Sequence, residues 1–187
     1  MAKIIIGLTG PMASGKDVVR KYFEEKYGAK GCKFSTILRD VLDRLYLEKS
    51  RENLVALSTS LREVFGQDLL AKVIAHDSLA NDAEIVVING VRRNSDIVHL
   101  RNLPNFFLIS INATPEVRFQ RMVSRNENAG DATKTFEKFM AEHQFETEIQ
   151  IPEVMSSAKF AIDNTEYEFP DLYKELDRVM GEIKKLV

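Results

Sequence analysis

The sequence has 187 residues, of which 44% are hydrophobic and 29% are charged, as expected for a single globular domain with a substantial core. Its formal net charge of −2 gives no general attraction to nucleic acid or to anionic membranes, and no apolar stretch approaches the ~20 residues that span a bilayer. The single cysteine, Cys32, excludes an internal disulfide and favours a reducing, cytoplasmic setting.

In chain order, the sequence alternates between buried strands and amphipathic helices. Residues 3–9 form an apolar run without polar alternation, which is typical of a strand covered on both faces. Similar runs follow at 84–88 and 106–111, with weaker ones at 30–34 and 158–163. Between them, apolar residues recur at helical spacing, as in Val18/Val19/Tyr22/Phe23, Leu38/Val41/Leu42/Leu45 and Leu172/Leu176/Val179/Ile183. This alternation predicts an α/β fold in which helices cover both faces of a five-stranded parallel sheet.

The loop after the first predicted strand has the pattern of a phosphate-binding loop. Gly10 and Gly15 bracket four residues, and Lys16 follows at the start of a predicted helix. In such a loop, backbone N–H groups turn toward an anion, the helix N-terminus adds positive potential, and the lysine supplies a charge for the outer phosphates. The pattern predicts an ATP site made by the consecutive residues Gly10, Pro11, Met12, Ala13, Ser14, Gly15, Lys16, Asp17 and Val18.

The residue after Lys16 departs from the usual pattern, in which a Ser or Thr hydroxyl ligates magnesium. Asp17 stands at this position and Val18 follows it. In one interpretation, the Asp17 carboxylate replaces the hydroxyl and meets Mg²⁺ directly or through water. In the other, Asp17 is an acidic residue that suits the first turn of a helix. The sequence leaves both interpretations open.

Three arginine-bearing segments follow later strands: residues 34–39 (FSTILR), 89–93 (NGVRR) and 118–125 (RFQRMVSR). Together with the glycine-rich loop, they resemble the P-loop nucleoside monophosphate kinase group, which includes adenylate kinase and dephospho-CoA kinase. The chain is most similar to a poorly characterised archaeal family of predicted nucleotide kinases within this group. The resemblance covers nearly the whole chain. It implies a three-layer P-loop NTPase fold, one domain over residues 1–187, with an acceptor-binding insert at about 35–80 and a short lid at about 118–148.

The resemblance implies a set of acceptor-binding arginines. By position, Arg39 matches the arginine that grips the acceptor phosphate, and a planar guanidinium suits two phosphate oxygens. Arg92 is the first candidate for a second acceptor contact and Arg93 the next. In the helical insert, Arg62 and Gln67 are further candidates. The alternative for Arg39 is an ordinary surface arginine on an amphipathic helix, and for Arg62 and Gln67 a structural role.

On the donor side, the resemblance assigns Arg121 and Arg125 to the donor phosphates. Because they lie four residues apart on one helical face, both can reach the same anion. The alternative is a solvated basic helix face. Asn164, after the last predicted strand, matches the position where related kinases hold the donor base, with a helix cap or turn residue as the alternative. Asn89 stands where the family has an aspartate that orients Mg²⁺, and its side-chain oxygen is a second candidate metal contact.

Other parts of the chain depart from adenylate kinase. A large zinc-binding lid is excluded because Cys32 stands alone, and residues 126–135 are expected to form a short lid tip. The following segment, residues 136–148, carries no arginine, and its glutamates include Glu142, Glu146 and Glu148. The three histidines, His76, His99 and His143, lack metal-ligand spacing.

These features predict a kinase that transfers the γ-phosphoryl group of ATP, with Mg²⁺ as cofactor, to a nucleoside monophosphate or similar nucleotide. The expected partners are ATP and a phosphate-bearing small molecule, without nucleic acid or membrane, and the chain is expected to be a monomer or homodimer. One alternative is a dephospho-CoA kinase. Another, motivated by Asp17-Val18 and Asn89, is an ATP-binding module with little transfer activity.

Overall fold

The computed structural model describes residues 3–125, 133–145, 148–166 and 168–187. The strands in these residues are β1 (Ile4–Thr9), β2 (Lys30–Lys33), β3 (Ile85–Val91), β4 (Phe106–Asn112) and β5 (Phe160–Asp163). The helices are α1 (Lys16–Tyr27), α2 (Phe34–Arg44), α3 (Arg51–Phe65), α4 (Leu69–Ala80), α5 (Asn94–Ile97), α6 (Pro115–Arg125), α7 (Phe136–Ala141), α8 (Ile151–Ser156) and α9 (Phe169–Lys185), with 3₁₀ turns η1 (Leu100–Asn102) and η3 (Glu142–Gln144). None of these helices is long and apolar enough to cross a membrane.

The strands form one parallel sheet in the order β2-β3-β1-β4-β5. This confirms the predicted five-stranded α/β fold. Leu8 in β1 lies opposite Asn89 in β3 and opposite Ile109 in β4, so the segments that follow these three strands emerge at the same edge of the sheet. β2 and β3 lie on one side of β1, and after β3 the chain crosses to the other side for β4 and β5. Such a change of direction opens a crevice at the carboxyl ends of the strands, where ligands bind in open α/β sheets.

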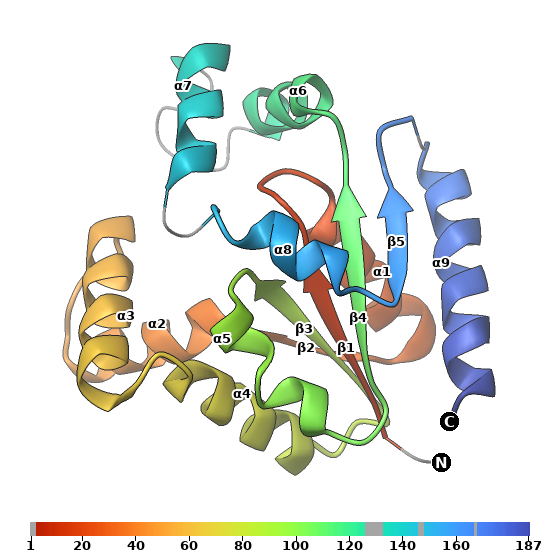
Figure 1. The fold of residues 1–187 in the computed structure, drawn as a ribbon, viewed down its shortest axis with the longest axis horizontal. Helices are drawn as coiled ribbons and strands as arrows, with labels where there is room; N and C mark the ends of the chain where they lie inside the picture. Colours follow the sequence, from red (N-terminus) through yellow and green to blue (C-terminus); the bar gives the residue numbers. More distant parts are fainter. Residues whose placement is uncertain (1–2, 126–132, 146–147, 167) are drawn as a thin grey trace.

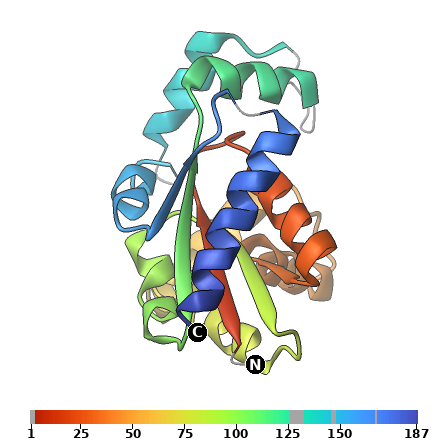
Figure 2. The same ribbon diagram turned by 90° about the vertical axis from the view of Figure 1, so that its right-hand side faces the viewer.

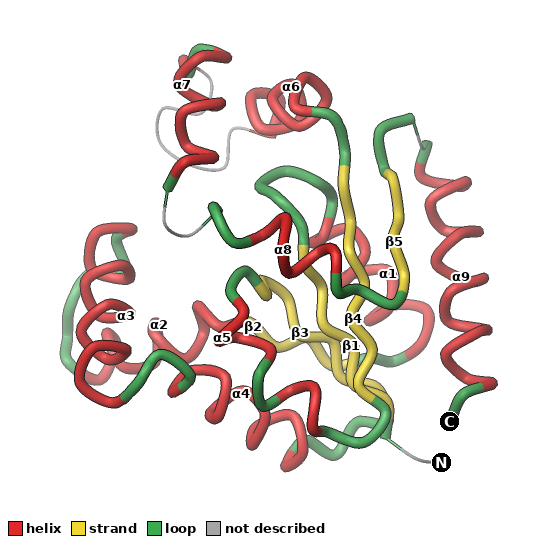
Figure 3. The backbone as a smooth tube through the Cα atoms, in the orientation of Figure 1, coloured by secondary structure: helices red, strands yellow, loops and turns green. Residues whose placement is uncertain are grey.

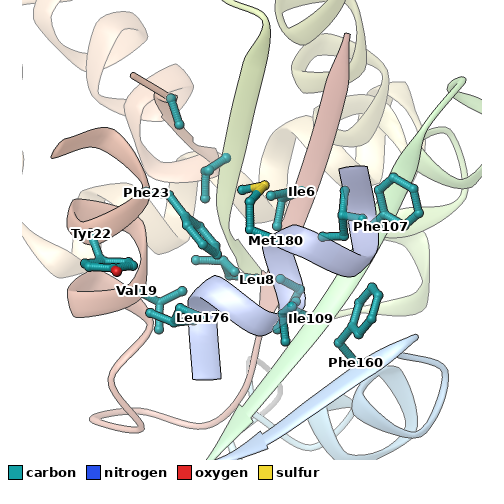
Figure 4. Packing of buried hydrophobic residues seen from close by; sticks show 14 of the residues in the cluster. Ile6, Leu8, Val19, Tyr22, Phe23, Phe107, Ile109, Phe160, Leu176 and Met180 are labelled. Atoms are coloured by element: carbon teal, nitrogen blue, oxygen red, sulfur yellow. The ribbon is translucent and has the colours of Figure 1, made fainter. Parts of the chain in front are cut away.

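Helices cover both faces of the sheet, while α6 and α7 lie at the end toward which β4 points (Figures 1 and 2). On one face, α1 and α9 pack on alternate residues of β1, including Ile6 and Leu8. Figure 4 shows this core, in which Phe23 of α1 and Met180 of α9 meet the sheet. On the other face, Ile5 belongs to a second core with residues of α2, α4, α5 and α8. Burial on both faces explains why the β1 sequence is apolar without alternation.

The predicted helical patterns at the two ends of the chain are confirmed by α1 and α9. Two details of the prediction are wrong. Phe34 begins α2 rather than ending β2, and its ring is buried in the second core. Leu45, expected on the apolar face of the next helix, has 55% of its surface exposed because α2 ends at Arg44 and the chain turns away at Tyr46 with a positive φ. The segment between β2 and β3 is helical as predicted, through α2, α3 and α4.

Candidate active site

The glycine-rich loop connects β1 to α1 at the carboxyl edge of the sheet, where Figure 3 shows the loops that join strands to helices. Gly10 has φ 143°, and a Cβ atom there would overlap the carbonyl oxygen of Ile111 in β4. Gly15 has φ 108°, and a Cβ atom there would overlap the side chain of Asn164. Only glycine fits both positions, since L residues rarely adopt these φ values and neither site has room for a side chain. The loop shape therefore depends on both glycines.

Lys16 is the first residue of α1 and is only 9% exposed. Its ammonium Nζ donates hydrogen bonds to the carbonyl oxygens of Gly10 and Pro11, both at 2.7 Å. Burial lowers the pKa of Lys16 from 10.5 to about 7, and the positive charge of Arg92 acts in the same direction. Burying an ammonium group among mainly neutral partners costs free energy. An anion bound beside Lys16 would offset that cost.

Asn164, directly after β5, is buried and holds the phosphate loop from the side. Its side-chain Nδ2 donates to the carbonyl oxygen of Ser14 at 2.9 Å, and its own backbone carbonyl accepts a hydrogen bond from Arg121 at 2.8 Å. The residue therefore supports both the loop and Arg121. Its predicted contact with the donor base is untested, and the structure gives its amide group a role in shaping the loop.

Asp17, in the first turn of α1, lies at the centre of a polar cluster. Its Oδ1 accepts hydrogen bonds from Nζ of Lys33 and Nδ2 of Asn89, both at 3.0 Å, and Arg20 lies 3.7 Å away. Partial burial raises the pKa of Asp17, but the hydrogen bond and charge of Lys33, with the charge of Arg20, lower it more, so the net pKa is below its usual value. The carboxylate is therefore ionised at neutral pH.

Two pockets flank this cluster among the described residues. One has a volume of about 380 Å³ and includes Val18, Arg121, Phe169 and Leu172; we call it the donor-side pocket because the resemblance assigns Arg121 to the donor phosphates. The other has a volume of about 520 Å³ and extends to α2, α3 and the end of β3; we call it the acceptor-side pocket because it includes Arg39, which the resemblance assigns to the acceptor. Four residues line both pockets: Ala13, Lys16, Asp17 and Arg125. Lys16 and Asp17 thus stand at the junction between two separate binding spaces.

Arg121 and Arg125 of α6 both border the donor-side pocket, and their contact with donor phosphates stays a prediction. Arg121 is half-buried, and its Nη1 is buried without a hydrogen-bond partner among the described residues. Burial lowers the pKa of Arg121, although its guanidinium stays charged at neutral pH. Arg125, at the end of α6, borders both pockets. Residues 126–132 of the predicted lid tip lie outside the described residues.

The predicted acceptor-side arginines line the second pocket but have different surroundings. Arg39 is exposed and has no hydrogen-bond or ion-pair partner among the described residues. Arg92 donates to Oε1 of the mostly buried Glu148 at 2.7 Å, and Arg93 lies next to it. Arg62 is buried and its guanidinium donates to Asp96 at 2.8 Å, which favours the structural alternative for this residue. Gln67 is exposed, and its backbone carbonyl oxygen also accepts from Arg62.

Comparisons with known proteins identify the family of this chain. A family model described as an AAA domain matches residues 6–145. A UPF0200 protein from Sulfurisphaera tokodaii is 31% identical over 175 residues, covering 92% of this chain and 94% of the relative. The chain therefore belongs to the UPF0200 family and carries an AAA domain. A second UPF0200 protein, from Methanocaldococcus jannaschii, is 27% identical and covers 96% of this chain and 90% of its own.

Solved structures show which fold this UPF0200 member adopts. Shikimate kinase from Bacteroides thetaiotaomicron superimposes with a TM-score of 0.65 at 15% identity, over 97% of this chain and 98% of the kinase. Shikimate kinase from Acinetobacter baumannii, solved with shikimate, gives a TM-score of 0.58 at 13% identity, over 96% and 94% of the two chains. The fold is therefore that of the P-loop kinases, which confirms the resemblance seen in the sequence.

The sequence analysis missed three residues at this site. Lys33 was overlooked although it ends β2, and the rule that ligands gather at the carboxyl ends of parallel strands would have included it. The sequence pattern gives Glu148 no role in the site, yet its carboxylate forms an ion pair with Arg92. The sequence pattern assigns no role to Arg118, but its side chain is only 4% exposed and contacts the phosphate loop. Nothing in the sequence separates Arg118 from Arg121 and Arg125.

Proposed function

We propose that this UPF0200 member is an ATP-dependent kinase that transfers the γ-phosphoryl group of ATP to a nucleoside monophosphate or a similar nucleotide. The observation that carries the proposal is the junction of the two pockets at Lys16 and Asp17. A protein that only holds ATP has no need of a second pocket that opens onto the same lysine. Two ligands that meet at this point are placed for in-line transfer, where positioning supplies much of the rate.

The charges of the acceptor-side pocket support a phosphate-bearing acceptor. Among the described residues, eight basic and four acidic side chains line it. Two of the acids, Asp96 and Glu148, are already paired with Arg62 and Arg92. Arg39 has no such partner among these residues, so its guanidinium is available for two oxygens of one phosphate. The excess of positive charge matches a dianion better than a neutral ligand.

The residues beside Lys16 fit Mg²⁺, which prefers oxygen ligands and usually takes one or two carboxylates together with phosphates and water. Asp17 provides an ionised carboxylate. Asn89 is 7% exposed, and its Oδ1 is buried without a hydrogen-bond partner among the described residues. A bound Mg²⁺ would neutralise charge on the donor phosphates. Lys16, the loop N–H groups and Arg121 would hold those phosphates, and Arg39 would hold the acceptor.

A second candidate function is transfer to a hydroxyl group, as in dephospho-CoA kinase. The observation that favours it is the presence of Glu148 and Asp17 in the acceptor-side pocket. A carboxylate can accept the proton that an attacking hydroxyl releases, whereas it repels the phosphate oxygen of a nucleoside monophosphate. Two proteins that share this fold are shikimate kinases, so shikimate is a further acceptor to test.

The deciding experiment is ADP release from Mg-ATP with a panel of acceptors: AMP, dAMP, CMP, UMP, GMP, dTMP, dephospho-CoA and shikimate. Stimulation by a nucleoside monophosphate supports the proposal, and stimulation by dephospho-CoA or shikimate alone supports the hydroxyl class. The Lys16→Met variant is the control and should abolish stimulated release. ATP binding without stimulation by any acceptor would contradict both kinase readings and favour an ATP-binding module.

A further inference from the structure

Arg118 is a buried cation that joins α6 to the phosphate loop. It is only 4% exposed. Its Nε donates to the carbonyl oxygen of Ala113 at 3.0 Å, and its Nη1 lies 3.4 Å from the carbonyl oxygen of Met12 in the loop. Met12 borders the acceptor-side pocket, whereas Arg118 does not. Arg118 therefore contacts a residue of the pocket lining without lining the pocket itself.

His143 holds the other side of the Arg118 guanidinium. Nδ1 of His143 lies 3.1 Å from the carbonyl oxygen of Phe139, and Nε2 lies 2.7 Å from Nη1 of Arg118. A carbonyl oxygen accepts only, so Nδ1 carries the proton and Nε2 is the acceptor for Arg118. The guanidinium also lies 5.4 Å from the centre of the Phe139 ring, a cation–π distance. Both partners belong to the α7–η3 segment, residues 136–144.

The hydrogen-bond partners of Arg118 are all neutral. Among the described residues, no carboxylate lies within ion-pair distance of its guanidinium. Burial lowers its pKa, and the more distant Glu148 and Glu116 oppose this change only in part. A buried cation without a close counter-ion is costly. An anion on the neighbouring phosphate loop would reduce that cost.

We propose that Arg118 is a positioning residue that couples the α7–η3 segment to the phosphate loop. Binding of a nucleotide polyphosphate to the loop then favours docking of this segment through His143. By reciprocal linkage, docking of the segment raises the affinity for the nucleotide. The role differs from that of Arg121 and Arg125, which face the pockets, because Arg118 acts through the Met12 carbonyl. The proposal rests only on the nucleotide-binding half of the proposed function.

The test measures ADP and ATP affinity by calorimetry, together with amide hydrogen exchange in residues 136–144 with and without ADP. We expect Arg118→Met to weaken both affinities by roughly 5-fold to 150-fold, the usual range of such coupling. We also expect ADP to protect the α7–η3 amides in the wild type but not in this variant. Arg101→Met, which removes an exposed arginine on η1, is the control and should match the wild type.

A second pair of variants at His143 serves if Arg118→Met does not fold. In His143→Gln the amide oxygen can still accept from Arg118, whereas His143→Leu has no acceptor but packs well against Phe139. The proposal expects wild-type affinity and ADP protection in the Gln variant and losses in the Leu variant. If His143 acts by packing alone, the Leu variant should keep its affinity and the Gln variant should lose it, which would overturn the proposal. Full ADP protection of the α7–η3 amides in a folded Arg118→Met protein would also overturn it.

These outcomes are separate from the proposed function. If no acceptor stimulates ADP release, the kinase proposal fails, while the nucleotide affinities of the Arg118 and His143 variants still decide this one. If transfer is found but Arg118→Met binds ADP as the wild type does, the kinase proposal stands and the coupling is refuted.

Discussion

Arg62 and Arg39 are both predicted to hold the acceptor, but their surroundings lead us to expect different effects on substitution. The side chains of Arg62 and Asp96 are 7% and 5% exposed, and the guanidinium also donates to the Gln67 carbonyl at 2.5 Å. Removing one partner of such a buried pair leaves the other charge uncompensated. Arg62→Met should therefore lower the free energy of unfolding by about 3–5 kcal/mol. Arg39→Ala, at an exposed site, should change it by less than about 0.5 kcal/mol.

Urea titration followed by circular dichroism would measure both values. In a chain of this size, the Arg62→Met loss corresponds to a melting temperature lower by roughly 6–20 °C. In Asp96→Asn, an amide oxygen remains for the backbone N–H groups of Arg92 and Arg93, but the charge is gone. If the ion pair causes the loss, the double variant should be little worse than either single one. An unchanged urea midpoint for Arg62→Met would refute the reasoning and return Arg62 to the acceptor-binding set.

Three further predictions concern ligands. Arg39→Ala should raise the acceptor KM far more than the ATP KM in steady-state kinetics, and equal effects would remove Arg39 from the acceptor side. Asp17→Ala should move the Mg²⁺ titration of turnover to higher concentration; an identical titration would leave Asp17 as a helix-start residue. The folded pKa of Lys16 is about 7, so its ammonium is lost as the pH rises above that value. Calorimetry between pH 7.5 and 9, where ATP phosphates no longer titrate, should show affinity falling by up to about tenfold per pH unit. A flat profile would mean that Lys16 keeps its proton.

Much of the fold could be predicted because its signals are local. An apolar run without alternation is typical of a strand buried on both faces, and β1 between its two cores is that case. The loop between Gly10 and Gly15 could also be recognised, because strand, glycine spacing and lysine are neighbours in the chain. The ends of elements were less certain: Phe34 begins a helix because its ring is needed in the second core.

Local sequence signals are therefore enough to predict the phosphate loop, the parallel sheet and the arginines near the strand ends, since backbone preferences and hydrophobic periodicity act between close neighbours. Only the tertiary structure distinguished the arginines from one another. Arg39 is open to the pocket, Arg62 is paired in the interior, and Arg118 is held between the loop and His143. The support that Asn164 gives to Ser14 joins residues 150 positions apart. Such contacts form because tertiary packing brings distant segments together, and the local spacing of residues in the sequence does not reveal them.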